Sequence, residues 1–362
     1  MVARGPGAVG CAHCTKLGAE IACGVCKHLV CEACGNDWST CAEPWGRVFR
    51  IGTTGRLVEV DPSGQFGLVS RWIGAMRLIE LRTLRWLSRV ELPSFGLGWG
   101  ELRPLLTSTC QLITPQYSAA VGHDEYRVFE GIQLRSLLGE SSWTVREAPA
   151  PVRSSGVTAH GDHYWYVNNT ETVTVISPDA PYTARTYEPL PRKVVQQVFV
   201  DGARSLLGSA TWGEINLHRM DGDRLVLLGH VTTSGNASWL AIGGTYLAAG
   251  VPSGVKVWRL AQDLSIGGLV LSIDRNVQKA ALSRDGRYLA VGVEGDRIMV
   301  HDIDTGTVDT FDEHTDRINL IRFVGDEQLL VTADRDNRVI VRPRTPTGYA
   351  RPLMPVTLGN TT

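Results

Sequence analysis

The sequence of 362 residues predicts an all-β fold built from a repeated unit of four strands. Two consecutive copies of this unit lie between Val277 and Arg344. Each copy alternates apolar strands with polar turns, such as Asp285-Gly286 in the first copy and Gly325-Asp326 in the second. Gly, Asn and Asp tolerate the positive φ that tight hairpins require, so these turns favour strands that pair with their chain neighbours.

The same phase recurs along most of the chain. The third strand of the first copy ends at His301-Asp302, and strands of similar pattern recur at intervals of about 40 to 50 residues from Leu57 to Arg344. A constant interval of this size is typical of architectures in which each unit packs on its neighbours. The aligned third-strand positions are Ile79, Phe129, Ile176, His218, Trp258, His301 and Arg342.

This period and turn chemistry resemble the WD-repeat family of β-propellers, whose repeat ends its third strand with Trp-Asp and a short turn. Only Trp258 keeps the Trp of that signature. The resemblance implies a seven-bladed, WD-repeat-like β-propeller. It also implies a hydrogen-bond set of His, Ser or Thr, Trp and Asp in each blade. In the last copy His314 and either Asp334 or Asp336 match this set, but Arg342 replaces the Trp, so we expect the set to be incomplete.

Three domains are expected: a cysteine-rich zinc-binding domain over residues 1–45, the propeller over 46–344, and a carboxy-terminal tail over 345–362. Propellers of this family commonly close by letting an early strand complete the last blade. Two segments are candidates for that strand, Arg47 to Ile51 and Leu353 to Leu358.

Proline distinguishes the two closing candidates. Pro355 lies in the later segment and cannot donate to a ladder, whereas the earlier segment has no proline. We therefore expect Val48 to Arg50 to pair with Val339 to Val341.

Seven of the eight cysteines lie in the first 41 residues, and six of them form three pairs with the spacing C-x2-C. Thiolates at this spacing clasp tetrahedral zinc, which predicts a structural site with one or two Zn(II) ions. A disulfide framework is disfavoured by the odd count and by a segment too short to bury a core. The expected ligands are Cys11, Cys14, Cys23, Cys26, Cys31, Cys34 and Cys41, with Asp37 or His28 as an additional ligand.

The cysteine spacing resembles the B-box of tripartite-motif proteins, over about 30 residues. The resemblance implies that the first and third pairs hold one zinc and that Cys23 and Cys26 begin a second site. The B-box completes its second site with two histidines that this sequence lacks, so Cys41 is the expected third ligand and His28 or Asp37 the fourth. A single zinc ribbon with spare cysteines is the alternative.

Composition excludes several classes of function. A formal net charge of -1 gives no general attraction to nucleic acid or anionic membranes, and no run of 18 apolar residues is present. The amino-terminal segment lacks the apolar region of a signal peptide, so a cytoplasmic location is expected. Arg outnumbers Lys 31 to 5, which is typical of a GC-rich bacterial genome.

Candidate partner-binding residues lie in loops outside the strand pattern. Residues 93–104 combine Gly and Pro with Phe95, Leu97 and Trp99, and the connection after Ser141 carries Trp143. Turns do not need large apolar side chains, so these residues either cap the propeller or bind a partner. The later strands of the first unit are rich in arginine, which fits a solvated edge or a docking site for an acidic partner.

We expect a non-enzymatic protein-interaction scaffold, because propellers offer rigid faces and a zinc module adds a second docking surface. Proteins that resemble this one often act in bacteria as sensor or adaptor beside an ATPase, protease or effector of the same operon, in defence or signalling systems. Two alternatives are a ubiquitin-ligase-like component with a RING or B-box module and a propeller enzyme with an axial site. A RING needs a fourth ligand pair, and no nucleophile motif is present.

Overall fold

The structure is a computed structural model. It describes residues 21–22, 29–30, 46–50, 55–71, 75–81, 85–91, 105–106, 111–118, 128–136, 144–147, 152–157, 164–168, 172–176, 184–187, 197–325, 329–345, 348–349 and 352–357. Within these residues every regular element is a β-strand. No helix capable of crossing a bilayer occurs in this part of the chain.

The described strands form seven sheets of at least four strands and one two-stranded pair. The pair consists of β1 (Ile21–Ala22) and β2 (Leu29–Val30). The first three large sheets contain β4 (Gly55–Val60), β5 (Phe66–Arg71), β6 (Ala75–Glu80) and β7 (Arg85–Glu91); β8 (Leu105–Leu106), β9 (Gln111–Ser118), β10 (Val128–Ser136) and β11 (Thr144–Glu147); and β12 (Val152–Val157), β13 (Tyr164–Asn168), β14 (Val173–Ile176) and β15 (Ala184–Tyr187).

The next three sheets repeat the same antiparallel order. They contain β16 (Gln197–Asp201), β17 (Leu206–Thr211), β18 (Glu214–Asp221) and β19 (Arg224–Thr232); β20 (Trp239–Gly243), β21 (Tyr246–Val251), β22 (Gly254–Leu260) and β23 (Ile266–Ile273); and β24 (Val277–Leu282), β25 (Tyr288–Val293), β26 (Arg297–Asp302) and β27 (Val308–Phe311). The last sheet contains β28 (Ile318–Val324), β29 (Leu329–Asp334), β30 (Arg338–Thr345), β3 (Gly46–Arg50), β31 (Gly348–Tyr349) and β32 (Pro352–Thr357).

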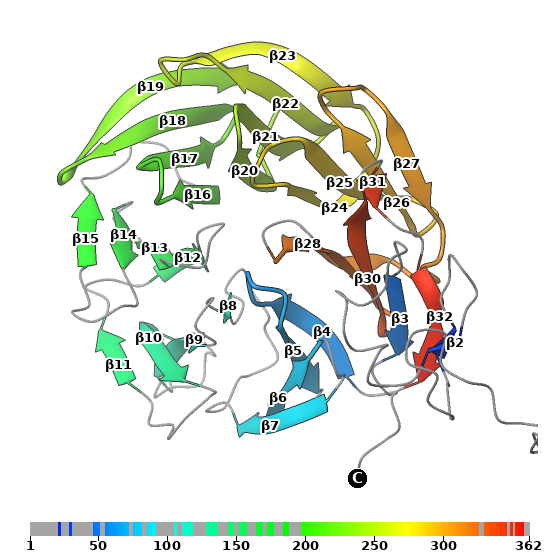
Figure 1. The fold of residues 1–362 in the computed structure, drawn as a ribbon. Coiled ribbons are helices and arrows are strands. Elements are labelled where there is room, and N and C mark those ends of the chain that lie inside the picture. Colours follow the sequence, from blue (N-terminus) through cyan, green and yellow to red (C-terminus); the bar gives the residue numbers. More distant parts are fainter. Residues whose placement is uncertain are drawn as a thin grey trace, which may run out of the picture.

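The large sheets stand around a common axis (Figure 1). The first strand of each sheet contacts the first strand of the next, and β28 of the last sheet contacts β4 of the first, so the ring is closed. The fourth strands, such as β19 and β23, lie on the outside of the ring (Figure 1). Each of the seven aligned sequence positions, from Ile79 to Arg342, lies in the third strand of its sheet, so the predicted phase is confirmed.

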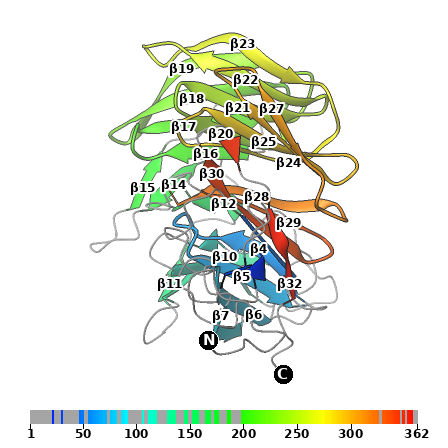
Figure 2. The same ribbon diagram turned by 45° about the vertical axis from the view of Figure 1, so that its right-hand side comes forward.

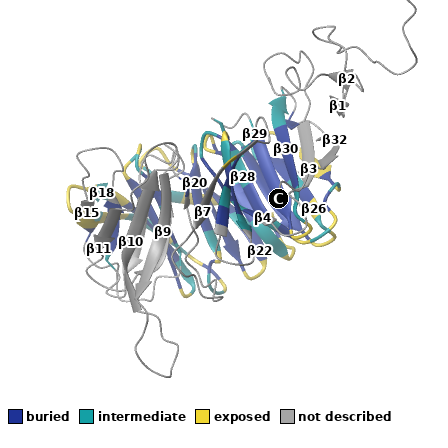
Figure 3. Cartoon of the chain, turned by 90° about the horizontal axis from the view of Figure 1, so that it is seen from below, coloured by how far each residue is buried: buried dark blue, intermediate teal, exposed yellow. Residues whose placement is uncertain are grey.

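The core lies between neighbouring sheets. Leu217 and Ile215 of β18 pack with Leu240 and Leu247 of the following sheet in one buried cluster. Equivalent clusters join the sixth sheet to the last and the last sheet to the first. Buried residues therefore fill the middle of the strands, and exposed residues concentrate at the turns (Figure 3).

The ring closes through the amino-terminal strand, as predicted. β3 pairs antiparallel with β30, with Val48 opposite Ile340 and Phe49 opposite Val339. The carboxy-terminal segment also takes part, because β32 pairs in parallel with the other side of β3. Pro355 of β32 is tolerated there because β32 is the last strand of the sheet path.

Residues that the sequence analysis assigned to a tail lie in this last sheet. β31 turns back onto β30, with Arg344 opposite Tyr349. The Tyr349 ring is buried, with its centroid 5.4 Å from that of Tyr288 in an edge arrangement and 5.7 Å from that of Phe323. The carboxy-terminal segment thus packs between the sixth and last sheets.

The turns after the first strands touch one another around one face of the ring. Gly244 N donates to Arg284 O of the next sheet at 2.7 Å, and Gly325 N donates to Pro62 O of the first sheet at 2.9 Å. Gly244 has a φ of 49°, and a Cβ there would lie 2.0 Å from Asp285 O. Only glycine allows the two turns to approach so closely.

Candidate functional site

The predicted zinc ligands and partner residues lie outside the described residues. These are Cys11, Cys14, Cys23, Cys26, Cys31, Cys34 and Cys41, the additional candidates His28 and Asp37, and the loop residues Phe95, Leu97, Trp99 and Trp143. The β1–β2 pair is described in that region, with Ala22 opposite Leu29, so the chain between these strands carries Cys23, Cys26 and His28. In the part of the chain that the structure describes, no three His, Cys, Asp or Glu side chains converge as a metal site.

A buried hydrogen-bond chain crosses the last sheet at the position where the WD-repeat resemblance implied a polar set. His314 Nδ1 lies 3.0 Å from Asp334 Oδ2, and His314 Nε2 lies 2.8 Å from Thr332 Oγ1. Arg342 Nη1 donates to the same Thr332 hydroxyl at 3.1 Å. These contacts select Asp334 over Asp336, which instead accepts a bond from the Thr315 hydroxyl.

Arg342 takes the place of the Trp, so the expectation of an incomplete set is wrong. A Trp would offer one N–H donor, and Arg342 supplies that donor to Thr332 through Nη1. Its second branch, Nη2, forms an ion pair with Glu313 Oε2 at 2.8 Å, and its guanidinium lies 4.4 Å from the centre of the Phe311 ring. Sequence reasoning missed this role because it treated the family's Trp as the donor that the set requires.

Burial controls the protonation states of His314 and Asp334 in this hydrogen-bond chain. It lowers the pKa of His314 and outweighs the hydrogen bond to Asp334, which acts in the opposite direction. Burial alone would raise the pKa of Asp334, but hydrogen bonds from His314 and from the backbone of Arg338 lower it. A neutral His314 therefore donates its Nδ1 proton to an ionised Asp334 and accepts from Thr332 at Nε2. This arrangement connects the segment before β28 to β29 and β30 and so fixes the geometry of the sheet.

Two more histidines at the aligned third-strand position are buried. Burial lowers the pKa of His218 and of His301. In the described structure, His218 Nδ1 and His301 Nε2 have no hydrogen-bond partner. Both side chains are thus held neutral and serve as packing residues in the same place as Trp258.

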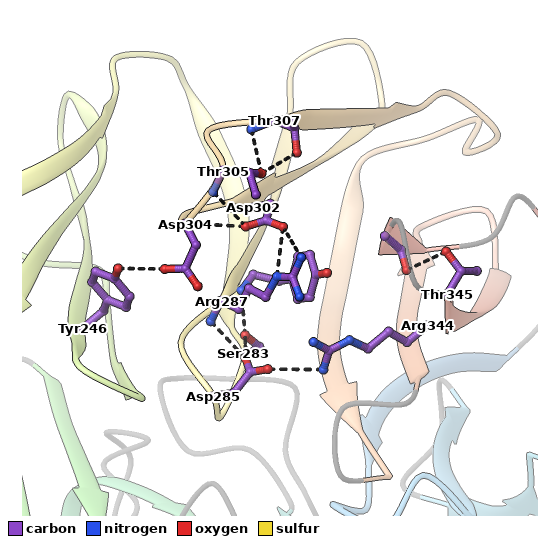
Figure 4. Close-up of polar contacts among 12 residues, drawn as sticks. Tyr246, Ser283, Asp285, Arg287, Asp302, Asp304, Thr305, Thr307, Arg344 and Thr345 are labelled. Atoms are coloured by element: carbon purple, nitrogen blue, oxygen red, sulfur yellow. Dashed lines mark hydrogen bonds and ion pairs between the residues drawn. The ribbon is translucent and has the colours of Figure 1, made fainter.

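The face that carries the turns of the fifth to last sheets is crossed by ion pairs (Figure 4). Asp302, at the end of β26, accepts from Arg287 at 2.9 Å. On one side the Tyr246 hydroxyl of the fifth sheet donates to Asp304, and on the other side Arg344 of the last sheet pairs with Asp285 (Figure 4). These contacts link three consecutive sheets.

An ion pair also spans the closure of the ring. Arg322 of β28 forms two bonds of 3.1 Å with the carboxylate of Glu59 in β4. Glu59 is buried, and the bidentate geometry fixes the relative position of the last and first sheets. Glu59 is the main reason that the pKa of Arg322 is raised. This ion pair and the one between Arg344 and Asp285 hold consecutive sheets of the described ring together.

The outer strands of three consecutive sheets carry exposed apolar side chains, and we call these residues the rim row. Its members are Val226 and Leu227 of β19, Leu269 and Val270 of β23, and Val308 of β27, with exposed fractions of 37%, 54%, 51%, 42% and 43%. Trp212, in the turn between β17 and β18, is 72% exposed. Monomeric proteins rarely gather apolar side chains on adjacent surface elements, so the rim row is a candidate interaction surface.

Comparison with solved structures agrees with the ring geometry. The chain is similar to the crystal structure of the Cps50 (Swd1) β-propeller domain of Myceliophteria thermophila, with a TM-score of 0.61 and 11% sequence identity. The match covers 83% of this chain and 100% of that one. No protein-family model matches the chain, and no curated protein is similar to it. The ring is therefore a β-propeller, and the likeness concerns the fold alone.

Proposed function

We propose that this protein is a non-enzymatic interaction scaffold whose propeller holds partner proteins. The observation that carries the proposal is the rim row, where five apolar side chains of three neighbouring sheets are exposed on a rigid ring. The buried polar groups of the last sheet support it, because they are occupied with one another and serve the fold. A propeller that keeps its polar network structural and its apolar groups exposed suits binding better than catalysis.

The scaffold is a seven-bladed propeller with an amino-terminal zinc module. The seven large sheets of the described chain and the unbroken contact between their first strands support the blade number. The β1–β2 hairpin supports the zinc module, because Cys23 and Cys26 fall in the connection between its strands and Cys31 follows β2. Short hairpins that present two cysteines are a common way to hold zinc.

The cellular role that we propose is that of an adaptor or sensor subunit in the cytoplasm of a bacterium. Its partners are proteins, such as an ATPase, protease or effector encoded in the same operon. The arginine-rich composition supports the bacterial source, and the near-zero net charge argues against nucleic acid or membrane as the main ligand.

Affinity purification and reconstitution test this function. The tagged full chain is isolated from its native host, the co-purifying proteins are produced separately, and each is mixed with the purified chain. A scaffold gives a complex of fixed stoichiometry by size-exclusion chromatography with light scattering. Trp99→Ala, in the loop that the sequence singles out, is expected to weaken the complex and leave the melting temperature unchanged. If no co-purifying protein binds the purified chain, the proposal is rejected.

A further inference from the structure

We propose that the rim row binds an extended, cationic segment of a partner protein, which adds to the free edge of β23. This inference rests on the proposed scaffold function and specifies the surface and the chemistry of its ligand. Three features of the outer strands carry it: their aligned apolar side chains, the uncharged edge of β23, and an excess of aspartates in the outer strands and their turns.

The apolar side chains occupy equivalent positions in successive sheets. Leu227 lies opposite His218, Leu269 opposite Trp258, and Val308 opposite His301 in the pairing of third and fourth strands. Each of these third-strand residues is the aligned position of its repeat. The rim row therefore follows the curvature of the ring, and β19 and β23 lie in contact with each other on its outer side (Figure 1, Figure 2).

A bulge follows Leu227 in β19 and Leu269 in β23. The register of β18 and β19 shifts between Leu217 and His218, which leaves Leu228 as the extra residue, half-buried against the core. The equivalent shift between Val257 and Trp258 leaves Val270 as the extra residue of β23. Bulges of this kind re-aim side chains and are designed features of sheets. Here the two bulges lie at the same height in neighbouring sheets, next to the exposed Leu227 and Leu269, and the bulge residue Val270 is itself exposed.

The edge of β23 carries no charged residue or proline, and the first residue of this strand, Ile266, lies close to β19 at Gly229. β23 is the last strand of its sheet, and its eight residues, IGGLVLSI, contain no charge and no proline. Natural edge strands are usually guarded by charged residues or proline. By contrast, β19 carries Arg224, β27 carries Asp309, and β7 carries Arg85 and Arg89. The backbone of β23 is thus suited to pair with an added strand.

The outer strands that carry the rim row and the turns that lead into them are acidic, whereas the paired strand β18 places Arg219 opposite Val226. The outer strands of the fourth to sixth sheets, with the turns that lead into them, span residues 221–232, 261–273 and 303–311. They contain five aspartates and one arginine. All five carboxylates, Asp221, Asp223, Asp263, Asp304 and Asp309, are exposed. Asp221, Asp223 and Asp309 form no ion pair within the described chain, so their charge is available to a ligand.

These charges select the occupant. Nucleic acid would be repelled by the five carboxylates. A second copy that used the same surface in a two-fold contact would set carboxylates against carboxylates. A segment that alternates Lys or Arg with apolar residues satisfies all three features: its backbone pairs with β23, its apolar side chains contact the rim row, and its cations face the aspartates.

Four labelled peptides test this chemistry by fluorescence anisotropy against the purified full chain. The first alternates Lys with Val over eight residues. The second replaces Lys by Glu, the third replaces Val by Ser, and the fourth methylates alternate backbone nitrogens. We expect the Lys-Val peptide to bind. Each of the other three should lose at least about tenfold in affinity, which corresponds to about 1.4 kcal/mol. Equal binding of the Glu-Val peptide would overturn the proposal.

Matched variants locate the site. The double variant Leu227→Ser/Leu269→Ser should weaken the Lys-Val peptide by at least about tenfold. Leu87→Ser is the control, because Leu87 is the bulge residue of β7 and is 37% exposed but lies outside the rim row. The affinity of Leu87→Ser for the Lys-Val peptide should equal that of wild type. A double variant that binds like wild type overturns the proposal. If the double variant unfolds, Asp223→Asn/Asp309→Asn replaces it, with the same expected direction.

Two further outcomes separate this inference from the scaffold function. A dimer that Leu269→Ser dissociates and that the Lys-Val peptide does not disrupt would mean that a second copy covers the rim row, which overturns the peptide proposal. Reconstituted complexes that survive the double variant would show that the scaffold binds its partners elsewhere, and the rim inference alone would fail.

Discussion

Arg342 is a fully buried arginine at a position where the repeats use residues as different as Trp258 and Ile79. A buried charge is costly unless it is paired and hydrogen-bonded. Arg342 meets this condition through Glu313, Thr332 and the Phe311 ring. Its hydrophobic stem and charged head together replace the bulk and the donor of a Trp.

Arg342→Ala is expected to lower the free energy of unfolding by about 3 to 5 kcal/mol, because it leaves Glu313 unpaired and a cavity in the sheet. Arg342→Trp should lose less, since Trp restores the bulk and an N–H donor for Thr332. Urea denaturation of the two variants and wild type measures the difference. Equal loss in both would mean that the donor is not what matters.

The three buried histidines predict a dependence of stability on pH. In the folded state the pKa of His218, of His301 and of His314 is lowered by burial, so below about pH 6.5 the unfolded chain binds more protons than the folded chain. Stability should therefore be fully present above that pH. As the pH falls below that value, each histidine that stays neutral in the folded state lowers the free energy of unfolding by up to about 1.4 kcal/mol per pH unit.

Denaturation at pH 7.5 and pH 5.5 checks this expectation. His301→Leu should reduce the loss of stability between the two pH values, because the uncharged side chain needs no proton. The variant isolates the histidine from Asp61, whose pKa is raised by burial and which acts in the opposite direction. A pH dependence identical to that of wild type would exclude His301 as a contributor.

At the scale of the element, the carboxy-terminal strands are the part of the fold that the sequence did not predict. The strands of the repeats were predictable because alternation and turn residues act locally. β31 and β32 were not, since nothing local signals that Tyr349 packs on Tyr288 or that β32 lies in parallel beside β3. Such contacts are long-range, and the three prolines after Arg344 favoured the interpretation as a tail.

Tyr349→Ala is expected to lower the free energy of unfolding by about 3 kcal/mol, because the ring is buried against Tyr288 and Phe323. Thermal denaturation of the full chain measures it. Val308→Ala, which shortens an exposed side chain of a neighbouring strand, is the control and should shift the melting temperature little. Truncation before Pro346 should have at least the effect of Tyr349→Ala. Tolerance of that truncation would show that the segment adds no stability.

The closing strand β3 leads to a prediction for the amino terminus. Removal of residues 1–51 deletes β3, which exposes the edge of β30 and leaves β32 without its neighbour. Unpaired edges promote association, so the truncated chain should aggregate. Light scattering during purification tests this, with a chain that begins at residue 45 and keeps β3 as the control. A monomeric, stable chain lacking β3 would contradict the closure.

At the scale of the whole molecule, we predict that the amino-terminal module binds zinc. Purified protein should contain about one to two zinc ions per chain, and their removal should unfold the amino-terminal module, since structural zinc contributes on the order of 10 kcal/mol. Metal analysis of protein prepared without chelator measures the content, and Cys23→Ser and Cys31→Ser should each reduce it. Less than about half an equivalent in wild type would refute the site.

The ring as a whole was predictable from the period of the repeat, and the partner surface was not. Sequence patterns revealed the seven third strands because each unit must bury the same face. The rim row escaped them, because Leu227 and Leu269 look like ordinary apolar strand residues until a bulge and an outer position expose them. Exposure is a property of the assembled ring and has no local signal.

The position of β3 has a consequence for biosynthesis. β3 leaves the ribosome well before its partners β30 and β32, because β3 ends at Arg50 and β30 begins only at Arg338. At about 5 to 20 residues per second, translation of the intervening chain takes on the order of tens of seconds. During that time the amino-terminal segment has no strand to join. The strand that closes the ring must therefore stay unpaired until β30 has been synthesised, so closure is a late step that follows translation of the other blades.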